Sequence, residues 1–296
     1  MIKLALIGNA EIQKYSVADR LWELLSVVTN TDFTYSTIPL TTREDVLTFF
    51  KKFRQDKTFK GFNIAIPWKD ILFDKLDNVE ELVRLSSVNT IYKDDEGRVV
   101  GVNTDPLAAQ KAVEAHANLY KCTSVLVIGL SGAGIPIARH MCDNLNKTTY
   151  IYDPSPDDIA EEVGQGIMRL STLAEVATRK YDLIINATPL GQALVHGHAN
   201  TFTAPLDLDI LEQVTHPATI VQETNYLPSN TLLLQMAGHL GLQVVAGSNM
   251  LVFRAAESFK RYFNVSIDEN TIRMLINEIS AYIAERETSL LDGHEA

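Results

Sequence analysis

Only two of the 296 residues are cysteine, and no apolar run approaches the ~20 residues that a membrane-spanning helix needs. Cys122 and Cys142 are too few for a disulfide framework or a cysteine-based metal site, and such sparse use of cysteine favours a reducing compartment. Lys3 is followed by only five apolar or small residues before Asn9, which is too short a run for a signal peptide. We therefore expect a cytoplasmic protein that does not associate with membranes.

Basic residues are also fewer than acidic residues. The sequence has 26 Lys and Arg against 37 Asp and Glu, and its net charge of −11 argues against nucleic acid or an anionic membrane as the main partner. His196 and His198 have a spacing that metals can use, but no cluster of acids or cysteines accompanies them. We expect a polar surface loop there and no metal. Hydrophobic residues make up 46% of the chain, which is enough for a substantial core.

Apolar patterning predicts two α/β parts. In the first, we expect strands at 2–7, 33–38, 60–66, 88–92 and 98–102, the last two forming a hairpin, and helices at 17–28 and 41–53. Thr42 is expected to cap the second of these helices. Next come a helix from Pro106 to about Ala117 and strands that alternate with helical segments, at 124–128, 148–152, 166–169, 181–186, 218–222 and 242–246. This βαβ alternation is typical of a parallel sheet.

After Gly247 the sequence is helical, with helices expected at 249–263 and 268–287. Helices that follow the last strand of such a parallel sheet often pack back on the first domain. We therefore expect a discontinuous first domain, 1–105 plus 248–296, and a second domain at 106–247, which the glycine-rich turn after Ser124 identifies as a dinucleotide-binding domain.

The segment Ser124–Gly134 has the pattern of a dinucleotide-binding turn: an apolar strand, a glycine-rich turn and the start of a helix predicted over 135–145. Gly129 would make the tight turn, Gly132 would let the backbone approach a pyrophosphate, and Gly134 would stand where the helix begins. Ser131 occupies the second position of the commoner G-x-G-x-x-G spacing. By itself, the motif is equally consistent with a simple tight turn.

An acidic residue follows this turn at the distance that NAD-binding proteins use. The predicted strand 148–152 ends at Asp153, and an acid about 20 residues after the first glycine binds the ribose hydroxyls of NAD. Asp157 and Asp158 follow, and no Arg or Lys occurs in 148–168, so a 2′-phosphate would be repelled. We expect NAD to be preferred over NADP. The alternative is that Asp153 only ends the strand or caps a helix.

Lys69 and Asp105 each lie just past a predicted strand, where open α/β sheets place their ligands. A lysine can exchange a proton with a hydroxyl or carbonyl oxygen while a carboxylate orients it. Position alone favours a simpler interpretation, a surface lysine and a helix-capping aspartate.

Six segments strengthen the catalytic interpretation: Gly61–Lys69, Ser87–Thr90, Gly101–Asp105, Asn186–Gly191, Asn225–Pro228 and Gly247–Val252. In order and spacing they closely resemble the signature segments of the shikimate dehydrogenase family, which includes quinate/shikimate dehydrogenases. The resemblance implies an α/β/α substrate domain, completed by C-terminal helices, and a Rossmann-type dinucleotide-binding domain. It also implies an NAD(P)-dependent oxidoreductase that interconverts a hydroxyl and a ketone on a shikimate- or quinate-like cyclic acid.

The resemblance also implies roles for single residues. Lys69 and Asp105 match the catalytic pair, Asn89 matches a ligand of a substrate hydroxyl, and Tyr226 matches a tyrosine near the substrate carboxylate. The expected cofactor-binding residues are Gly129, Ser131, Gly132, Ala133, Gly134, Asp153, Asn186, Ala187, Thr188 and Gly247.

Three substrate positions differ from the family pattern. Only Ser16 remains of two serines in the N-terminal substrate loop, where Lys14 stands in place of a hydroxyl, and Arg254 stands in place of a glutamine. Ala65 replaces a threonine. The added cations predict a shikimate- or quinate-like acid with a different, more anionic set of substituents, since Arg can clamp a carboxylate. The alternative is that Lys14 and Arg254 point to solvent.

Two other functions remain open from the sequence. One is a catalytically weak NAD- or metabolite-binding sensor on the same fold, which the Lys69 and Asp105 pair disfavours. The other is a two-domain oxidoreductase of the methylenetetrahydrofolate dehydrogenase kind, which the Asn103-Thr104-Asp105 segment disfavours. The sequence does not fix the oligomeric state, and a homodimer is compatible with it.

Overall fold

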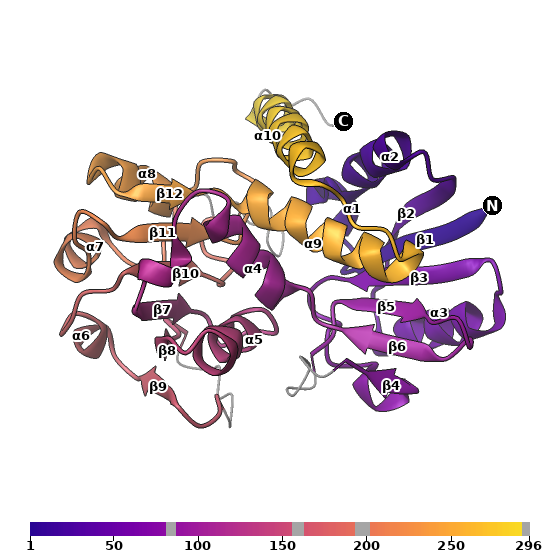
Figure 1. Cartoon of the computed structure of the whole chain (residues 1–296), viewed down its shortest axis with the longest axis horizontal. Helices are drawn as coiled ribbons and strands as arrows, with labels where there is room; N and C mark the ends of the chain where they lie inside the picture. The colour runs from indigo at the N-terminus through magenta and orange to yellow at the C-terminus, as the bar shows by residue number, and fades with distance from the viewer. Residues whose placement is uncertain (81–86, 156–162, 193–201, 292–296) are drawn as a thin grey trace. The chain divides into compact units, whose positions relative to one another are not determined.

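The computed structural model of the protein describes residues 1–80, 87–155, 163–192 and 202–291. The chain forms two compact units, one from Met1–Thr104 and Arg254–Ile279 and the other from Asp105–Phe253 and Ser280–Ala296. Each unit contains a six-stranded sheet with helices packed on it (Figure 1). The predicted two-sheet α/β fold is confirmed, whereas the domain boundaries predicted at 105/106 and 247/248 remain a proposal.

The sheet of the first unit is mixed, with strand order β2-β1-β3-β5-β6-β4. Strands β1 (Ile2–Gly8), β2 (Phe33–Pro39) and β3 (Phe59–Ile64) are parallel. Strand β5 (Thr90–Lys93) is antiparallel to both β3 and β6 (Val99–Val102), so the predicted hairpin is confirmed. The short strand β4 (Asn78–Val79) pairs with β6 in parallel and had no sequence signal.

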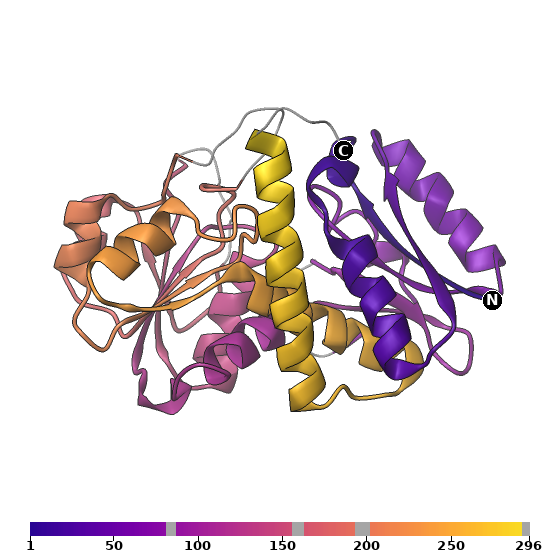
Figure 2. The same cartoon turned by 90° about the horizontal axis from the view of Figure 1, so that it is seen from above.

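Helices cover both faces of this sheet (Figures 1 and 2). On one face, Trp22 of α2 (Ala18–Thr29) stacks on Tyr35 with ring centroids 4.7 Å apart and meets Tyr262 of α9 (Gly247–Phe263) at 5.5 Å. On the other face, α3 (Arg43–Gln55) buries Phe50 and Phe53. Thr42 caps α3 through a capping box with Asp45, which confirms the predicted cap. The four-residue helix α1 (Ile12–Tyr15) had not been predicted.

The sheet of the second unit is entirely parallel, with strand order β12-β11-β10-β7-β8-β9. This is the doubly wound order of a Rossmann-type dinucleotide-binding domain. The strands are β7 (Ser124–Ile128), β8 (Thr148–Tyr152), β9 (Ile167–Leu170), β10 (Leu183–Asn186), β11 (Ile220–Glu223) and β12 (Gln243–Val245).

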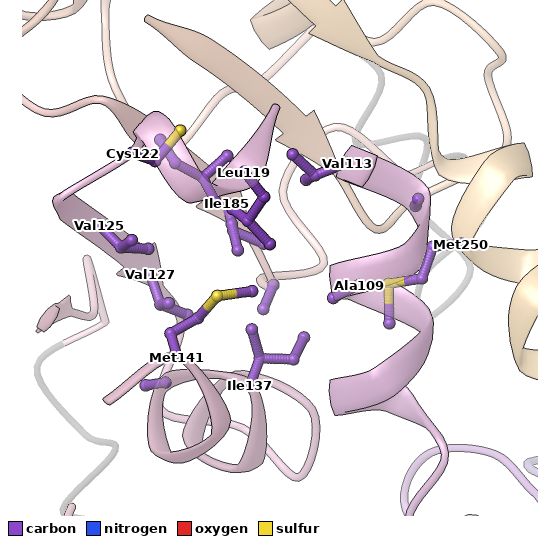
Figure 3. Packing of buried hydrophobic residues seen from close by; sticks show 14 of the residues in the cluster. Ala109, Val113, Leu119, Cys122, Val125, Val127, Ile137, Met141, Ile185 and Met250 are labelled. Atoms are coloured by element: carbon purple, nitrogen blue, oxygen red, sulfur yellow. The ribbon is translucent and has the colours of Figure 1, made fainter. Parts of the chain in front are cut away.

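Both faces of the parallel sheet are buried. Val125 and Val127 point to one face, where α4 (Asp105–Glu114) and α5 (Gly134–Arg139) pack (Figure 3). Leu126 and Ile128 point to the other, which α6 (Leu173–Val176), α7 (Leu208–Val214) and α8 (Leu232–His239) cover. Burial on both sides explains the continuous apolar runs in the sequence. The helix predicted at 135–145 is α5 followed by a π-helical turn at His140–Asn144.

The last helix, α10 (Glu269–Leu291), contributes residues to both units. Of the helices within the described ranges, none combines the length and hydropathy that crossing a membrane requires. Asp157, Asp158 and the His196-Gly-His198 loop lie outside the described residues.

Candidate active site

Asn89 lies in a buried polar cluster of the first unit, and the described residues bond to only one side of its amide. Its Oδ1 atom accepts hydrogen bonds from the Thr104 N–H at 2.9 Å, the Thr104 hydroxyl at 3.1 Å and the Thr90 hydroxyl at 3.0 Å. Its Nδ2 atom is buried and makes no hydrogen bond to any residue in the described ranges. Because a buried donor without an acceptor is costly, this amide is well suited to donate to a ligand oxygen.

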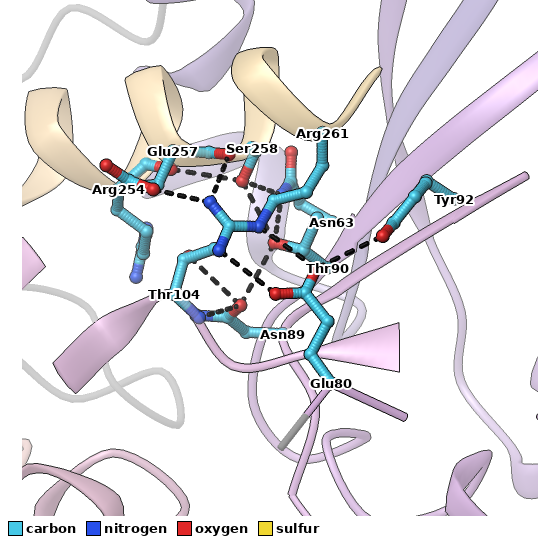
Figure 4. Close-up of polar contacts among 10 residues, drawn as sticks. All are labelled: Asn63, Glu80, Asn89, Thr90, Tyr92, Thr104, Arg254, Glu257, Ser258 and Arg261. Atoms are coloured by element: carbon cyan, nitrogen blue, oxygen red, sulfur yellow. Dashed lines mark hydrogen bonds and ion pairs between the residues drawn. The ribbon is translucent and has the colours of Figure 1, made fainter. Parts of the chain in front are cut away.

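A chain of hydrogen bonds fixes which way the Asn89 amide faces (Figure 4). The Tyr35 hydroxyl donates to Asn63 Oδ1 at 3.1 Å, and Asn63 Nδ2 donates to the Thr90 and Ser258 hydroxyls at 3.1 and 3.0 Å. Thr90 in turn donates to Asn89 Oδ1, while Ser258 of α9 donates to the Arg254 carbonyl oxygen at 3.0 Å. With its oxygen surrounded by donors, the amide must present its NH₂ group on the other side.

Lys69 follows β3 in a turn whose backbone is tied to the same cluster. Its carbonyl oxygen accepts the Val88 N–H at 2.9 Å, directly before Asn89. The Asn103 side chain donates to the Ser87 carbonyl oxygen at 3.1 Å from the end of β6. The segment 87–89 therefore holds the Lys69 turn on one side and the Asn103-Thr104 segment on the other.

Asp105 follows Thr104 directly and is the first residue of α4, with 0% of its surface exposed. It is counted in the second unit and Lys69 in the first, so their pairing remains a prediction. The two segments that carry them are nevertheless both bonded to residues 87–89 within the first unit.

Two of the divergent substrate positions and the retained Ser16 have different surroundings. Lys14 is mostly exposed and forms an ion pair with Glu11 at 3.2 Å. The Ser16 hydroxyl accepts the Ala18 N–H at 3.1 Å at the start of α2. Arg254 is half-buried on α9, and its side chain leaves the helix on the side where Thr104 and Asn89 lie (Figure 4).

Sequence reasoning missed an ionic cluster on the same face of α9. Arg261 donates to Glu257 one turn earlier and to both carboxylate oxygens of Glu80, at 3.2 and 3.1 Å. Tyr92 donates to Glu80 at 3.1 Å, and burial together with that carboxylate raises the pKa of Tyr92 to about 12. The pairing anchors α9 next to β4 and β5. Its partners are so distant in sequence that no local motif signals it.

In the second unit, the glycine turn is as tight as its sequence predicts. Gly129 has a φ of +118°, and a Cβ there would lie 2.9 Å from the Ala187 carbonyl. At Gly134, a Cβ would lie 2.0 Å from the Gly129 oxygen. The Ser131 hydroxyl accepts the N–H groups of Ala133 and Gly134 at 3.3 and 3.1 Å and donates to the Ala187 oxygen at 3.1 Å. Ser131 thus joins the turn to the loop after β10.

Asp153 supports this turn. Its Oδ2 atom accepts the Leu130 N–H at 2.6 Å, and its Oδ1 atom accepts the Ser155 N–H at 2.8 Å. Both carboxylate oxygens are therefore engaged by the protein backbone, which matches the alternative of a structural residue at the strand end.

The loops after β10 and β11 are bonded to each other. Asn186 Oδ1 accepts the Thr188 N–H at 3.0 Å and the Thr188 hydroxyl at 2.7 Å. The Asn225 side chain donates to the carbonyl oxygens of Thr188 and Leu190, both at 3.0 Å. Gly247 packs so closely that an added Cβ would lie 1.9 Å from the Asn225 oxygen. The half-buried Tyr226 follows in the same loop.

Glu223, which sequence reasoning missed, lies beneath these loops. Its carboxylate is completely buried and accepts hydrogen bonds from the Asn186 side chain, the Thr231 hydroxyl and the N–H groups of Thr224 and Asn225. Burial raises its pKa to about 7, although these hydrogen bonds act in the opposite direction. The missed signal was a charged residue at the end of a fully buried strand.

Within the described residues, no group of three His, Cys, Asp or Glu side chains could hold a metal ion.

No family model matches the sequence. The shikimate dehydrogenase (NADP(+)) of Geobacillus kaustophilus is 32% identical over 225 residues, which cover 74% of this chain and 78% of that protein. The crystal structure of shikimate 5-dehydrogenase from Thermus thermophilus with NADP(H) and shikimate has a TM-score of 0.79 at 23% identity, covering 94% of this chain and 99% of that one. The quinate dehydrogenase of Corynebacterium glutamicum with NAD has a TM-score of 0.74, also at 23% identity and with the same coverage.

The predicted preference for NAD over NADP is wrong. The curated relative at 32% identity is an NADP(+) enzyme, and the two structures at 23% identity speak to the fold alone. The prediction took Asp153 as a ribose ligand and expected the acids after it to repel a 2′-phosphate; in the structure the Asp153 carboxylate also accepts the backbone N–H groups of Leu130 and Ser155.

Proposed function

The chain belongs to the shikimate dehydrogenase family and is an oxidoreductase of the shikimate/quinate dehydrogenase kind. From this premise we propose that it interconverts a hydroxyl and a ketone on a shikimate- or quinate-like cyclic acid, with NADP as its cofactor. The observation that carries the substrate assignment is the buried NH₂ group of Asn89, which has no partner within the described part of the chain. A cyclic polyol offers the hydroxyl oxygen that this donor lacks.

Lys69 and Asp105 are the proposed catalytic pair. In the oxidation direction the Lys69 amine would accept the proton of the reacting hydroxyl, in the reduction direction its ammonium would return it to the ketone oxygen, and the Asp105 carboxylate orients the side chain. NADP, when bound, would accept the hydride from the carbon that bears this oxygen. The support for the pair is that the Lys69 turn and the Thr104 backbone are both bonded to residues 87–89.

The proposed cofactor site consists of the glycine turn and the loops beside it. The turn fits a dinucleotide, since Gly129 and Gly134 bring the chain closer to itself than any side chain would allow. Ser131, Gly132 and Ala133 complete the turn, and Asp153 holds its backbone. The adjoining surface is formed by Asn186, Ala187, Thr188 and Gly247.

Lys14, Ser16, Arg254 and Tyr226 are the proposed contacts to the acid group and its neighbours. The ion pair of Lys14 with Glu11 reduces the net charge that this lysine brings. Arg254 is therefore the stronger candidate for a carboxylate clamp, because guanidinium groups bind carboxylates in a bidentate way.

Steady-state assays test the function directly. Purified protein is assayed with NADP and NAD against shikimate, quinate and their dehydro forms, in both directions. We expect turnover of at least one of these acids, with a higher kcat/KM for NADP. Binding of NADP without turnover of any cyclic acid would contradict the proposal and favour a sensor.

Two further proposals concern the whole molecule, a cytoplasmic location and a homodimeric state. Light scattering coupled to size exclusion tests the second, since a dimer has twice the 32.9 kDa mass of the chain.

A further inference from the structure

We propose that Glu223 is a positioning residue for the dinucleotide, in that its carboxylate holds the loops after β10 and β11 in the arrangement that receives the cofactor. The inference rests on the proposed function only in assigning a dinucleotide to these loops. Glu223 itself has no sequence signature of a ligand, and its side chain is completely buried.

The first observation is the hydrogen-bond pattern of the carboxylate. Oε1 accepts the N–H groups of Thr224 and Asn225 at 2.9 and 3.0 Å, and Oε2 accepts the Thr231 hydroxyl at 3.0 Å. The Asn186 NH₂ group lies 3.0 Å from both oxygens. All of these groups act as donors, so only a group with acceptors on both atoms satisfies the site.

The second observation is what those donors do next. Asn186 is paired with Glu223 in register on adjacent parallel strands, and its oxygen accepts the Thr188 N–H and hydroxyl. Thr231 caps α8 by accepting the Leu234 N–H. One carboxylate therefore connects the end of β10, the loop after β11 and the start of α8.

The third observation is electrostatic. Glu223 is bonded to an amide on β10, to two backbone N–H groups of the 224–225 loop and to a hydroxyl at the start of α8. None of these groups carries a charge. Burial raises the pKa of Glu223 to about 7. The carboxylate consequently takes up a proton as the pH falls through neutrality, and the protonated oxygen no longer accepts from one of its donors.

The test is equilibrium binding of NADP to the full chain without substrate, which is independent of turnover. Glu223→Gln keeps the shape but turns an NH₂ group toward the Asn186 NH₂, and we expect roughly tenfold weaker binding. Glu212→Gln, at an exposed position on α7 of the same unit, is the matched control and is expected to bind like the wild type. Glu223→Asp keeps the charge and should bind with intermediate affinity.

The pH profile separates a positioning role from a merely structural one. The ratio of wild-type to E223Q affinity should fall as the pH is lowered from 8.5 to 5.5, since only the wild type has a carboxylate to protonate. Titration of NADP itself cancels in this ratio.

A pH-independent ratio, or E223Q binding as tightly as E212Q, would overturn the inference, as would a wild type that binds no dinucleotide. If E223Q fails to fold, the affinity of E223D at pH 8.5 decides, and E223D binding NADP as tightly as E212Q would overturn the inference. Wild-type NADP binding without turnover of any cyclic acid would instead defeat the proposed function alone.

Discussion

The backbone N–H of Thr104 donates to Asn89 Oδ1 across 2.9 Å, so the residue directly before Asp105 sets the orientation of the amide that we assign to the substrate. The Thr104 hydroxyl adds a second donor at 3.1 Å. Orientation of the amide and placement of the proposed catalytic carboxylate thus depend on the same few backbone atoms.

Replacement of Asn89 by Asp should weaken substrate binding while it spares cofactor binding. The carboxylate keeps an oxygen for the Thr104 and Thr90 donors but loses the NH₂ group. We expect the KM for the cyclic acid to rise about tenfold or more, equivalent to ~1.4 kcal/mol, with a smaller change in kcat. Steady-state kinetics and NADP titration measure these effects.

Asn118→Asp is the control for that variant. Asn118 also accepts a backbone N–H through its side-chain oxygen, from Tyr120 at 3.1 Å, but it is not part of the proposed site. A KM for N89D that stays at the wild-type value would remove Asn89 from the substrate site.

Lys69→Met should abolish most of the activity and leave the fold intact. A positioned general acid or base contributes about 10²–10⁴-fold to the rate, so kcat should fall at least ~100-fold at unchanged NADP affinity. Lys75→Met changes an exposed lysine of the same unit and serves as the control. Equal activities of the two variants would show that Lys69 is not the proton carrier.

Gly129→Ala should cost more stability than Gly241→Ala, although both glycines have positive φ. An added Cβ at Gly241, where φ is +70°, meets nothing within 4 Å, and we expect a loss of about 1 kcal/mol from backbone strain alone. At Gly129 the Cβ would also press on the Ala187 carbonyl at 2.9 Å. Urea unfolding should rank the variants in that order, and only G129A should also lose NADP affinity. Equal losses for both would mean that the turn can relax around a side chain.

We expect acid to lower the stability of the second unit because it protonates the Asp182 carboxylate. Partial burial raises the pKa of this carboxyl, but the N–H groups of Ser124 and Thr123, the Thr123 hydroxyl and His216 lower it further, to about 2. Since the pKa in the folded state lies below the ordinary value of 3.8, the stabilisation is present above pH ~3.8 and is lost as the pH falls toward 2.

Unfolding midpoints at pH 5 and pH 3 check this expectation. The Asp182→Asn variant should lose less stability between the two pH values than the wild type, whereas Asp209→Asn, on an exposed position of α7, should follow the wild type. Parallel losses in D182N and the wild type would assign the acid sensitivity to other groups.

Local patterns predicted the elements of this fold well, because burial on both faces of the parallel sheet leaves an unmistakable apolar run at Val125–Ile128. The Thr42 cap followed from the same kind of short-range signal. Asn89 was found only through the family resemblance, since a strand-end asparagine alone is more often a cap.

Long-range contacts explain what the sequence did not reveal. Arg261 and Glu80 are joined only by the fold, and the ring of donors around Glu223 comes from three separate segments. At Asp153 the fold adds a structural role that the motif does not reveal, since its carboxylate accepts the N–H groups of Leu130 and Ser155.

The hydrogen-bond chain from Tyr35 through Asn63 and Thr90 to Asn89 runs in one direction, because each step needs a donor behind it and an acceptor ahead. Turning the Asn89 amide around would leave the Thr104 N–H and two hydroxyls facing an NH₂ group. The site therefore selects a hydrogen-bond acceptor, such as a hydroxyl oxygen, at this position of the substrate. A substrate analogue that carries an ammonium group in place of the bound hydroxyl would meet donor with donor, and the protein should discriminate against aminated rings even where their size and carboxylate are unchanged.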